Sequence, residues 1–488
     1  RDLNVRSRRQ RQMCIRDRSR GVVISSSNVN LLNVSSRKNN TNNAQGLFGV
    51  GIYVFDSDIL FNSVKVDSNN NFDHNGEGAG VYIYESDGEI MDFISTKNIG
   101  GYGTGLFIEN SNINVKNSTI TKNSGIVGPG INIKRSFVNI DSTLIDSNTT
   151  TNLGIGFGGG INIENTDYGY KVMISNSIIS NNSSHNGGGI YNQTTNMIAG
   201  PSGNIGILEL LNVKIIKNTS YDAGGGIYNY GNKYADLYRN VLIANNLSSS
   251  NGGGIYQQSN YYENPLIINS TISNNESGSS GGGLFFNHIT NNSRIVNSLI
   301  YHNRHIGQPL DVFSNSIGGN VSQTMASNSI IQNWEAMFGF ENDQNIFFTD
   351  PLFVDLYGND YHLSNYSPAL GKGALVDSLP SYDLDGSVRI FPGGSNPDLG
   401  CYESPLSERI GTTKYYVNVE VGSDSSATGS SNEPFKTLDR AMNAAFNGDT
   451  VVIYPGTYVG DLNFDQKSFF LGSLFLETGI NSFIDQTV

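Results

Sequence analysis

An all-β solenoid, a parallel β-helix, is the fold class that the sequence predicts. Two observations predict it. A glycine-rich phrase recurs along the chain, as Gly-Gly-Gly-Ile-Tyr-Asn at Gly187–Asn192 and again at Gly224–Asn229. Short runs of alternating apolar and polar residues separate the copies, without the period of a helix. A repeat of this kind indicates one supersecondary unit that stacks on itself.

The repeat has a nearly constant length. The first glycines of its exact and looser copies stand at 49, 78, 103, 128, 158, 187, 224, 252 and 281, so the spacings lie between 25 and 37 residues, most of them 25 to 30. One unit, 158–186, contains a glycine turn, an alternating strand at Ile161–Glu164, a loop, and a further strand from Val172 that is broken near Asn176. About three strand pieces per repeat describe one coil of a β-helix.

Stacked coils place equivalent side chains in columns. The apolar residue of each phrase is expected to fill the interior: Ile52, Val81, Leu106, Ile131, Ile161, Ile190, Ile227, Ile255 and Leu284. Asparagines at the turns are expected to stack as ladders of amide hydrogen bonds, among them Asn181, Asn245 and Asn274. Strand alternation places Asn192 and Asn229 on the core side.

A second phrase, Asn-Ser-Xaa-Ile, recurs at Asn117, Asn176, Asn269, Asn297 and Asn328. With both phrases, the sequence resembles the right-handed parallel β-helix repeat family, which has the pectin-lyase-like fold. The resemblance covers most of the chain. It implies a fold, and it does not imply an activity.

The β-helix is expected over residues 21–345, and the composition changes after it. The segment 346–404 resembles the C-terminal closing segment of secreted β-helix repeat proteins, and we expect it to cover the open edge of the last coil. Residues 405–414 are interpreted as a linker. Residues 415–488 resemble the start of a second, truncated β-helix domain, with one short capping helix near 437–447.

The first segment, 1–20, differs from the rest of the chain. It is strongly basic and lacks the apolar core of a signal peptide. It resembles translated adapter sequence, so we expect it to be foreign to the fold. A basic tail that binds an anionic partner is the alternative.

Composition excludes several classes of function. The net charge of −13 argues against nucleic acid as a partner. No apolar run of the length that spans a bilayer is present, so the chain is not expected to cross a membrane. The two cysteines, Cys14 and Cys401, suggest neither a disulfide framework nor a zinc site. We expect an extracellular or cell-surface monomer.

The residue that follows the core position of each phrase points outward and is mostly aromatic. The candidates for contact with carbohydrate are Tyr82, Phe107, Tyr191, Tyr228, Tyr256 and Phe285. Aromatic rings edged with amides and acids can stack on sugar faces and bond their hydroxyls. The alternative is that the rings only stack on each other or lie under the loops.

The acidic and basic residues of the sequence do not form a recognisable catalytic or metal-binding pattern. A lyase needs a base beside carboxylates and a hydrolase needs a carboxylate pair. Glu109, Glu164 and Asp236 are expected to be scattered, and the basic cluster Arg294, His302, Arg304 and His305 is expected to be a solvated surface loop. Asp383 and Asp385 are weak candidates for Ca²⁺ ligands, because the other ligands of a calcium loop are missing. No other cofactor is expected.

Three functions remain open. The first is a secreted or cell-surface scaffold, adhesin-like or in contact with a polysaccharide or cell-surface glycan, without an evident catalytic site. The second is a polysaccharide lyase or glycoside hydrolase. The third is a purely structural spacer.

Overall fold

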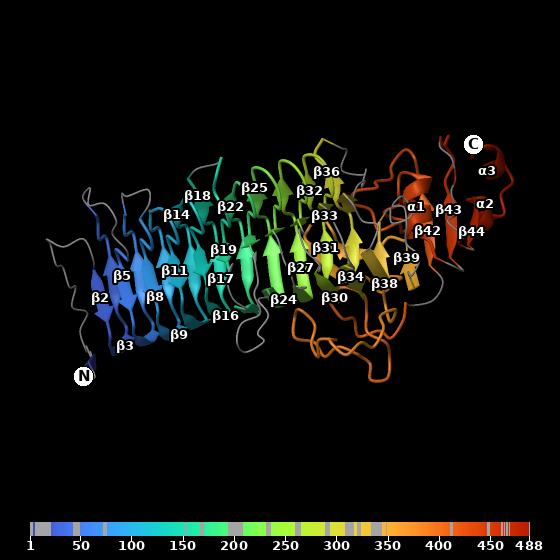
Figure 1. Cartoon of the computed structure of the whole chain (residues 1–488). Helices are drawn as coiled ribbons and strands as arrows, with labels where there is room; N and C mark the ends of the chain where they lie inside the picture. The colour runs from blue at the N-terminus through green and yellow to red at the C-terminus, as the bar shows by residue number, and fades with distance from the viewer. Residues whose placement is uncertain are drawn as a thin grey trace.

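The structure is a computed structural model. It describes residues 3–4, 21–41, 49–71, 76–151, 154–165, 170–193, 208–230, 236–258, 265–287, 293–307, 317–319, 324–332, 344–347, 349–409, 413–446, 449–459, 462, 464, 467 and 469–487. Most of the basic segment 1–20 lies outside this range. Successive coils stack into a right-handed parallel β-helix, so the predicted fold class is confirmed (Figure 1).

Three parallel sheets form the sides of the solenoid. Sheet 1 has 11 strands, one from each coil. Its strands carry the glycine-rich phrases, and they are β2 (Val22–Ser25), β5 (Ile52–Phe55), β8 (Val81–Tyr84), β11 (Leu106–Glu109), β15 (Ile131–Lys134), β19 (Ile161–Glu164), β23 (Ile190–Gln193), β26 (Ile227–Tyr230), β29 (Ile255–Gln258), β33 (Leu284–Asn287) and β37 (Ile317–Gly319).

Sheet 2 has 21 strands in two parallel runs. The first run contains β1 (Leu3–Asn4), β3 (Asn28–Leu32), β6 (Asp58–Asn62), β9 (Asp87–Met91), β12 (Asn112–Lys116), β16 (Phe137–Asp141), β20 (Val172–Ser175), β30 (Leu266–Ile268) and β34 (Ser293–Val296). The second run contains β4 (Ser35–Arg37), β7 (Lys65–Asp67), β10 (Ile94–Thr96), β13 (Thr119–Thr121), β17 (Leu144–Asp146), β21 (Ile178–Ser180), β31 (Thr271–Ser273) and β35 (Leu299–Tyr301). The runs join in the long strands β24 (Leu208–Ile216), β27 (Leu237–Ala244) and β38 (Thr324–Ile331), and β39 (Gln344–Phe347) follows β38.

Sheet 3 is narrow and has seven two-residue strands. They are β14 (Ser124–Gly125), β18 (Thr149–Thr150), β22 (Ser183–Ser184), β25 (Thr219–Ser220), β28 (Leu247–Ser248), β32 (Glu276–Ser277) and β36 (Arg304–His305). The described residues after the solenoid form β40 (Phe353–Asp355), β41 (Asp360–Leu363), β42 (Lys414–Val417), α1 (Leu438–Ala444), β43 (Thr450–Ile453), β44 (Phe470–Ser473), α2 (Phe475–Thr478) and α3 (Ser482–Asp485).

Residues with positive φ turn the corners of each coil. In one coil they are Asn110, Asn117, Lys122 and Gly128, with φ of 49°, 48°, 56° and 54°. Among residues with a side chain, asparagine enters this left-handed region most readily. The phrase Asn-Ser-Xaa-Ile therefore recurs because its asparagine is a corner residue.

The glycine corner has a second requirement. At Gly187, where φ is 64°, a Cβ atom would stand 2.4 Å from the carbonyl oxygen of Ile190. At Gly189 it would stand 2.6 Å from the carbonyl oxygen of Gly226 in the next coil. Successive coils approach so closely here that a side chain does not fit, which explains the glycine-rich phrase.

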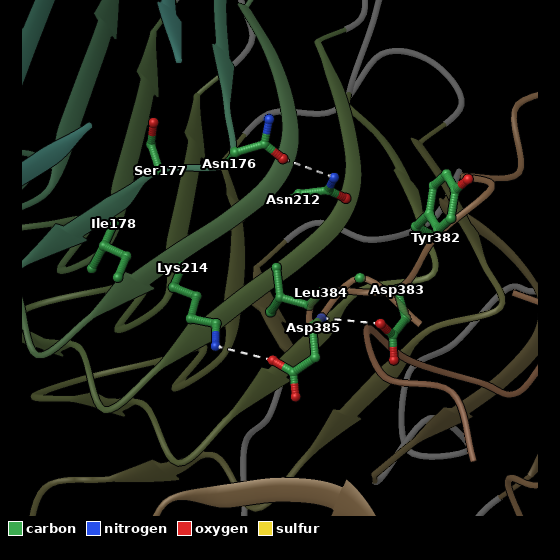
Figure 2. Close-up of a pocket in the computed structure, with 10 residues that line it drawn as sticks. Asn176, Ser177, Ile178, Asn212, Lys214, Tyr382, Asp383, Leu384 and Asp385 are labelled. Carbon is green, nitrogen blue, oxygen red and sulfur yellow. Dashed lines mark hydrogen bonds and ion pairs between the residues drawn. The ribbon is translucent and has the colours of Figure 1, made fainter. Parts of the chain in front are cut away.

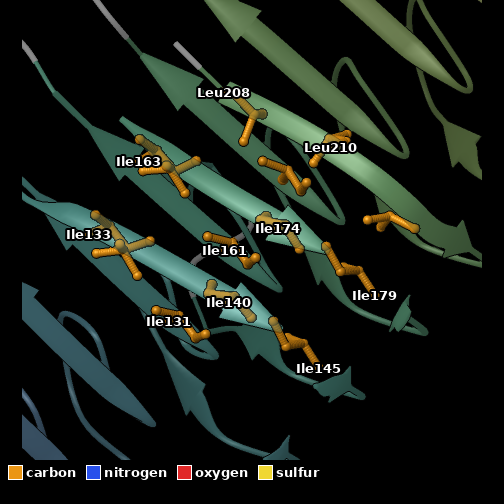
Figure 3. Packing of buried hydrophobic residues seen from close by; sticks show 14 of the residues in the cluster. Ile131, Ile133, Ile140, Ile145, Ile161, Ile163, Ile174, Ile179, Leu208 and Leu210 are labelled. Carbon is orange, nitrogen blue, oxygen red and sulfur yellow. The ribbon is translucent and has the colours of Figure 1, made fainter. Parts of the chain in front are cut away.

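The interior is filled by aliphatic columns, as expected (Figure 3). Ile131, Ile161 and Ile190 pair in register on adjacent strands of sheet 1, and all three are fully buried. Sheet 2 contributes a facing column that includes Ile140 and Ile174. Burial of these side chains is the main stabilising contribution of each coil.

An asparagine ladder runs along a corner of the solenoid. Each side-chain Nδ2 atom donates to the Oδ1 atom of the next asparagine, at 2.8 to 3.0 Å. The members are Asn39, Asn69, Asn98, Asn123, Asn148, Asn182, Asn218, Asn246, Asn275 and Asn303. Asn181, Asn245 and Asn274 are not in this ladder, because each is the positive-φ residue just before a member. The amide of Asn274 nevertheless donates to Asn245 of the preceding coil, as stacking predicts.

The segment after the solenoid corrects an expectation. It lies along the flank of sheet 2 and does not simply cover the last coil (Figure 1, orange). Corner asparagines of several coils hold it: Asn240 donates to the carbonyl oxygen of Tyr382, and Asn297 donates to that of Ala374. Apolar side chains on the outer face of sheet 2, such as Leu242 and Leu299, pack under it and are buried. Covering this apolar surface stabilises the flank of sheet 2.

The second unit contains the parallel strands β42 to β44, and helix α1 follows the N-cap Thr437, within the predicted range 437–447. The sequence predicts one helix, and the structure adds α2 and α3, each of four residues. No helix in the described part of the chain combines the length and the apolar character that a bilayer crossing needs.

Candidate functional site on the outer face of sheet 1

The outward aromatic residues of sheet 1 form two stacks. Tyr53, Tyr82 and Phe107 form the first, with centroids of adjacent rings 5.7 and 4.9 Å apart. Tyr191, Tyr228, Tyr256 and Phe285 form the second, with centroids 5.1, 4.7 and 5.4 Å apart. We call these two stacks the aromatic ladder. In the two coils between them, the ladder position is occupied by Asn132 and Asn162.

The aromatic ladder offers little ring surface to a ligand. Tyr82, Phe107, Tyr191 and Tyr256 are each 8% exposed or less. Tyr228 and Phe285 are half-buried. Such burial agrees with the alternative function of these rings, in which they stack only on each other. Carbohydrate contact by these six residues stays a prediction, and their burial disfavours it.

The neighbouring column, two residues further along each strand, is more accessible. We call it the outer strip. It runs in register through Phe55, Tyr84, Glu109, Lys134, Glu164, Gln193, Tyr230, Gln258 and Asn287. All of these residues except Glu109 are partly exposed, to the same class as Tyr228 and Phe285 of the aromatic ladder. The strip therefore presents aromatic rings at two places and charged or amide groups between them.

The centre of the outer strip is a cluster of charges. The Glu109 carboxylate accepts a hydrogen bond from the Tyr82 hydroxyl at 2.7 Å and one from Arg135 at 2.6 Å. Lys134 lies 3.3 Å from the same carboxylate. Glu164 accepts from the amide of Asn162 at 2.9 Å. Glu109 and Glu164, expected to be scattered, thus share one column with a lysine between them.

Glu77 adds a third carboxyl group to this charged cluster. Burial raises the pKa of Glu77, and the nearby charge of Glu109 raises it further, while Lys134 and Tyr82 act in the opposite direction. A carboxyl group with a raised pKa beside charged carboxylates is a common arrangement at sites of proton transfer. Glu109, Lys134 and Glu164 occupy the same position after the glycine-rich phrase in three successive repeats, and this was the sequence signal for the cluster. Glu77 precedes the glycine-rich phrase of its repeat, so the alternating strand pattern does not indicate it.

The inward asparagines lie in a polar pocket of the core. Asn192 and Asn229 are fully buried, and the amide of Asn192 donates to Asp236 at 3.1 Å. Asn229 donates to the Tyr238 hydroxyl at 2.7 Å and to Gln257 at 2.9 Å. Asp236 itself is 1% exposed. These residues have no access to a ligand from solvent, so their role is structural.

Asp383 and Asp385 lie beside a hollow where the closing segment meets β24 (Figure 2). Asp383 is buried and accepts backbone hydrogen bonds from Asp385, Ser387 and Glu403 at 2.7 to 3.0 Å. Asp385 points the other way, toward Lys214, at 3.6 Å. No group of three residues suited to hold a metal ion occurs among the described residues. The Asp383 side chain therefore stabilises a turn of the closing segment.

The predicted basic cluster is not one solvated loop. His302 is buried, and its Nε2 atom lies 3.4 Å from Asp350. Arg304 pairs with Glu276 in the preceding coil. Only Arg294 of the four is exposed. Coil stacking explains the difference, since it brings acids from other parts of the chain to these side chains.

The chain is similar to one protein family and to a solved structure. Residues 420–463, in the second unit, match the family described as "Protein of unknown function (DUF1565)". The chain is a parallel β-helix protein. Among solved structures, the "Crystal structure of pectate lyase Pel9A" aligns with a TM-score of 0.37 and 13% sequence identity, over 72% of this chain and 88% of that chain. No curated protein matches the sequence.

Proposed function

We propose that this β-helix protein is a secreted or cell-surface scaffold that binds a polysaccharide along the outer strip. The observation that carries the proposal is the register of the strip. It presents partly exposed rings at Tyr84 and Tyr230, with the charged and amide groups of Glu109 to Gln193 between them. Adjacent strands lie about 4.8 Å apart, so these groups form a regular array.

Such an array suits a polymer of sugar rings. Aromatic faces stack on sugar rings, and carboxylates, amides and cations bond hydroxyl groups. Lys134 and Arg135 are each about one-third exposed, so they also reach acidic groups of a ligand. A long ligand that contacts several coils gains affinity from many weak contacts.

The test is binding of a polysaccharide panel to the double variant Tyr84→Ala/Tyr230→Ala. We expect the retardation of the protein in polysaccharide-containing gels to fall strongly, with an unchanged melting temperature. The matched control is Tyr221→Ala/Tyr382→Ala, which removes two exposed rings elsewhere on the chain. Equal retardation of the wild type and both double variants would contradict the proposal.

Cleavage of the bound polymer is the second candidate function, and the raised pKa of Glu77 favours it. Glu77, with Glu109 or Glu164, supplies the pair of carboxyl groups that acid–base cleavage of a glycosidic bond requires. This function predicts new reducing ends or unsaturated products from a polysaccharide panel, lost in Glu77→Gln. If no polymer yields products, with or without Ca²⁺, the protein binds without cleaving.

A further inference from the structure

A second hollow lies where the closing segment of the solenoid meets the second unit. Its volume is about 890 Å³. Tyr357 and Tyr366, from the closing segment, form one wall, and β42 with the loop 424–433 forms the other. A volume of this size is typical of sites for small molecules, which often lie between structural units.

Contacts between the two units hold this hollow open. Leu352, before β40, packs in the small core of the second unit against Tyr415 and Phe435. Below them, the buried Asp350 pairs with Arg440 of helix α1. These contacts connect the two walls through their base, so the hollow exists before a ligand arrives.

The walls combine exposed rings with hydroxyl groups. Tyr357 is 39% exposed and Tyr366 is 50% exposed. The opposite wall contributes the hydroxyl-rich run Ser425–Ser431, which includes Ser426, Thr428 and Ser430. Tyrosine faces stack on the apolar faces of sugar rings, and short hydroxyl side chains both donate to and accept from sugar hydroxyls.

The charges of the hollow select against an acidic ligand. Four carboxylates line it, those of Asp350, Asp355, Asp424 and Glu433, against the two cations Lys414 and Arg440. Both cations already have acidic partners, since Lys414 lies 2.9 Å from Glu477 and Arg440 pairs with Asp350. A uronate would therefore meet an excess of negative charge without an available cation.

We propose that this hollow binds a neutral oligosaccharide, whose rings stack on Tyr357 and Tyr366 and whose hydroxyls bond the loop 424–433. The site is separate from the outer strip and does not depend on the function proposed for it. It forms only where the two units adjoin, so a chain built from several such units would repeat the site at each junction.

The experiment is isothermal titration of the full chain with neutral hexasaccharides of glucose, xylose and mannose, and with hexagalacturonate. We expect at least one neutral hexasaccharide to bind and hexagalacturonate to bind at least tenfold more weakly. The variant Tyr357→Ala/Tyr366→Ala is expected to weaken the neutral ligand about tenfold or more. Both side chains are exposed, so an unchanged melting temperature will show that the variant folds.

Two controls separate this site from the outer strip. Tyr221→Ala removes an exposed ring elsewhere, and Tyr84→Ala/Tyr230→Ala alters the outer strip; both are expected to bind the neutral hexasaccharide as the wild type does. The proposal is overturned if no neutral hexasaccharide binds, if the Tyr357/Tyr366 variant binds equally well, or if hexagalacturonate is preferred.

Discussion

Glycine and asparagine determine where each coil turns. Asparagine occupies two kinds of position at one corner: Asn181 has positive φ and its side chain reaches Asp146, while Asn182 is buried in the ladder. The two neighbours look alike in the sequence. The backbone torsion at the first residue directs the second side chain inward, where its amide must find partners.

The clearest test at this scale is Asn192→Leu. Leucine would pack beside Ile163 of the preceding coil, but the buried Asp236 would lose the hydrogen bond from Asn192. Asp236 keeps the hydrogen bonds from Leu208 and Tyr238, so the loss is that of one hydrogen bond, about 0.5–1.5 kcal/mol, and we expect a lower free energy of unfolding in urea. Gln193→Leu, at the adjacent outward position, is the control. A free energy equal to that of the wild type would show that Asp236 does not depend on Asn192.

At the scale of elements, a charged contact fastens the closing segment to sheet 2. The Nδ1 atom of His362 in β41 lies 2.5 Å from Asp360, and its Nε2 atom lies 2.8 Å from Asp385. The ring stacks on Tyr402, with centroids 4.0 Å apart. Asp385 also faces Lys214 of β24 at 3.6 Å, which connects the segment to the solenoid.

This contact predicts a pH dependence. Burial lowers the pKa of His362, but the hydrogen bonds and charges of Asp360 and Asp385 outweigh it, so the pKa is raised. A raised pKa in the folded state means stability that is complete below the ordinary histidine value, about 6.5, and is lost as pH rises through the folded value. Hydrogen exchange of residues 360–363 should therefore accelerate across this window in the wild type and less in His362→Gln. The same acceleration in both proteins would contradict this prediction.

At the scale of the whole molecule, one buried ion pair connects the two units. Burial alone would raise the pKa of Asp350, but the charge of Arg440, together with His302, holds the pKa well below its ordinary value. Arg440 also lies over the ring of Phe435, 4.7 Å from its centroid. The junction therefore depends on the ion pair between Arg440 of helix α1 and Asp350 of the closing segment.

Arg440→Met should loosen this junction. Removing one partner of a buried ion pair costs roughly 3–5 kcal/mol because the other charge stays buried. We expect faster cleavage by a protease between the units, within residues 405–414, and a separate, lower melting transition for the second unit. Lys436→Met, which removes an exposed cation just before the same helix, is the control. Unchanged proteolysis of Arg440→Met would mean that the other contacts, those of Leu352 and of the Asp350 backbone N–H with the Asn443 carbonyl, hold the units together.

Much of the fold could be predicted from the sequence because a solenoid repeats its local rules. The core column through Ile161 and Ile190, the glycine corner and helix α1 each follow from patterns within one repeat or one short segment. The site was less predictable. Tyr82 and Tyr84 both point away from the core in the repeat pattern. Tyr82 is buried, however, and Tyr84 is partly exposed. Side-chain crowding between coils decides this, and no single repeat contains that information.

By itself the sequence determined the period, the interior columns and the corners, since strand alternation and torsional preference are properties of neighbouring residues. Only the tertiary structure decided which outward groups meet. It brought the Tyr82 hydroxyl and Arg135 onto the Glu109 carboxylate, laid the closing segment on the flank of sheet 2, and formed the hollow between the units. Charge pairing and burial depend on groups far apart in the chain, so they appear only when the coils are stacked.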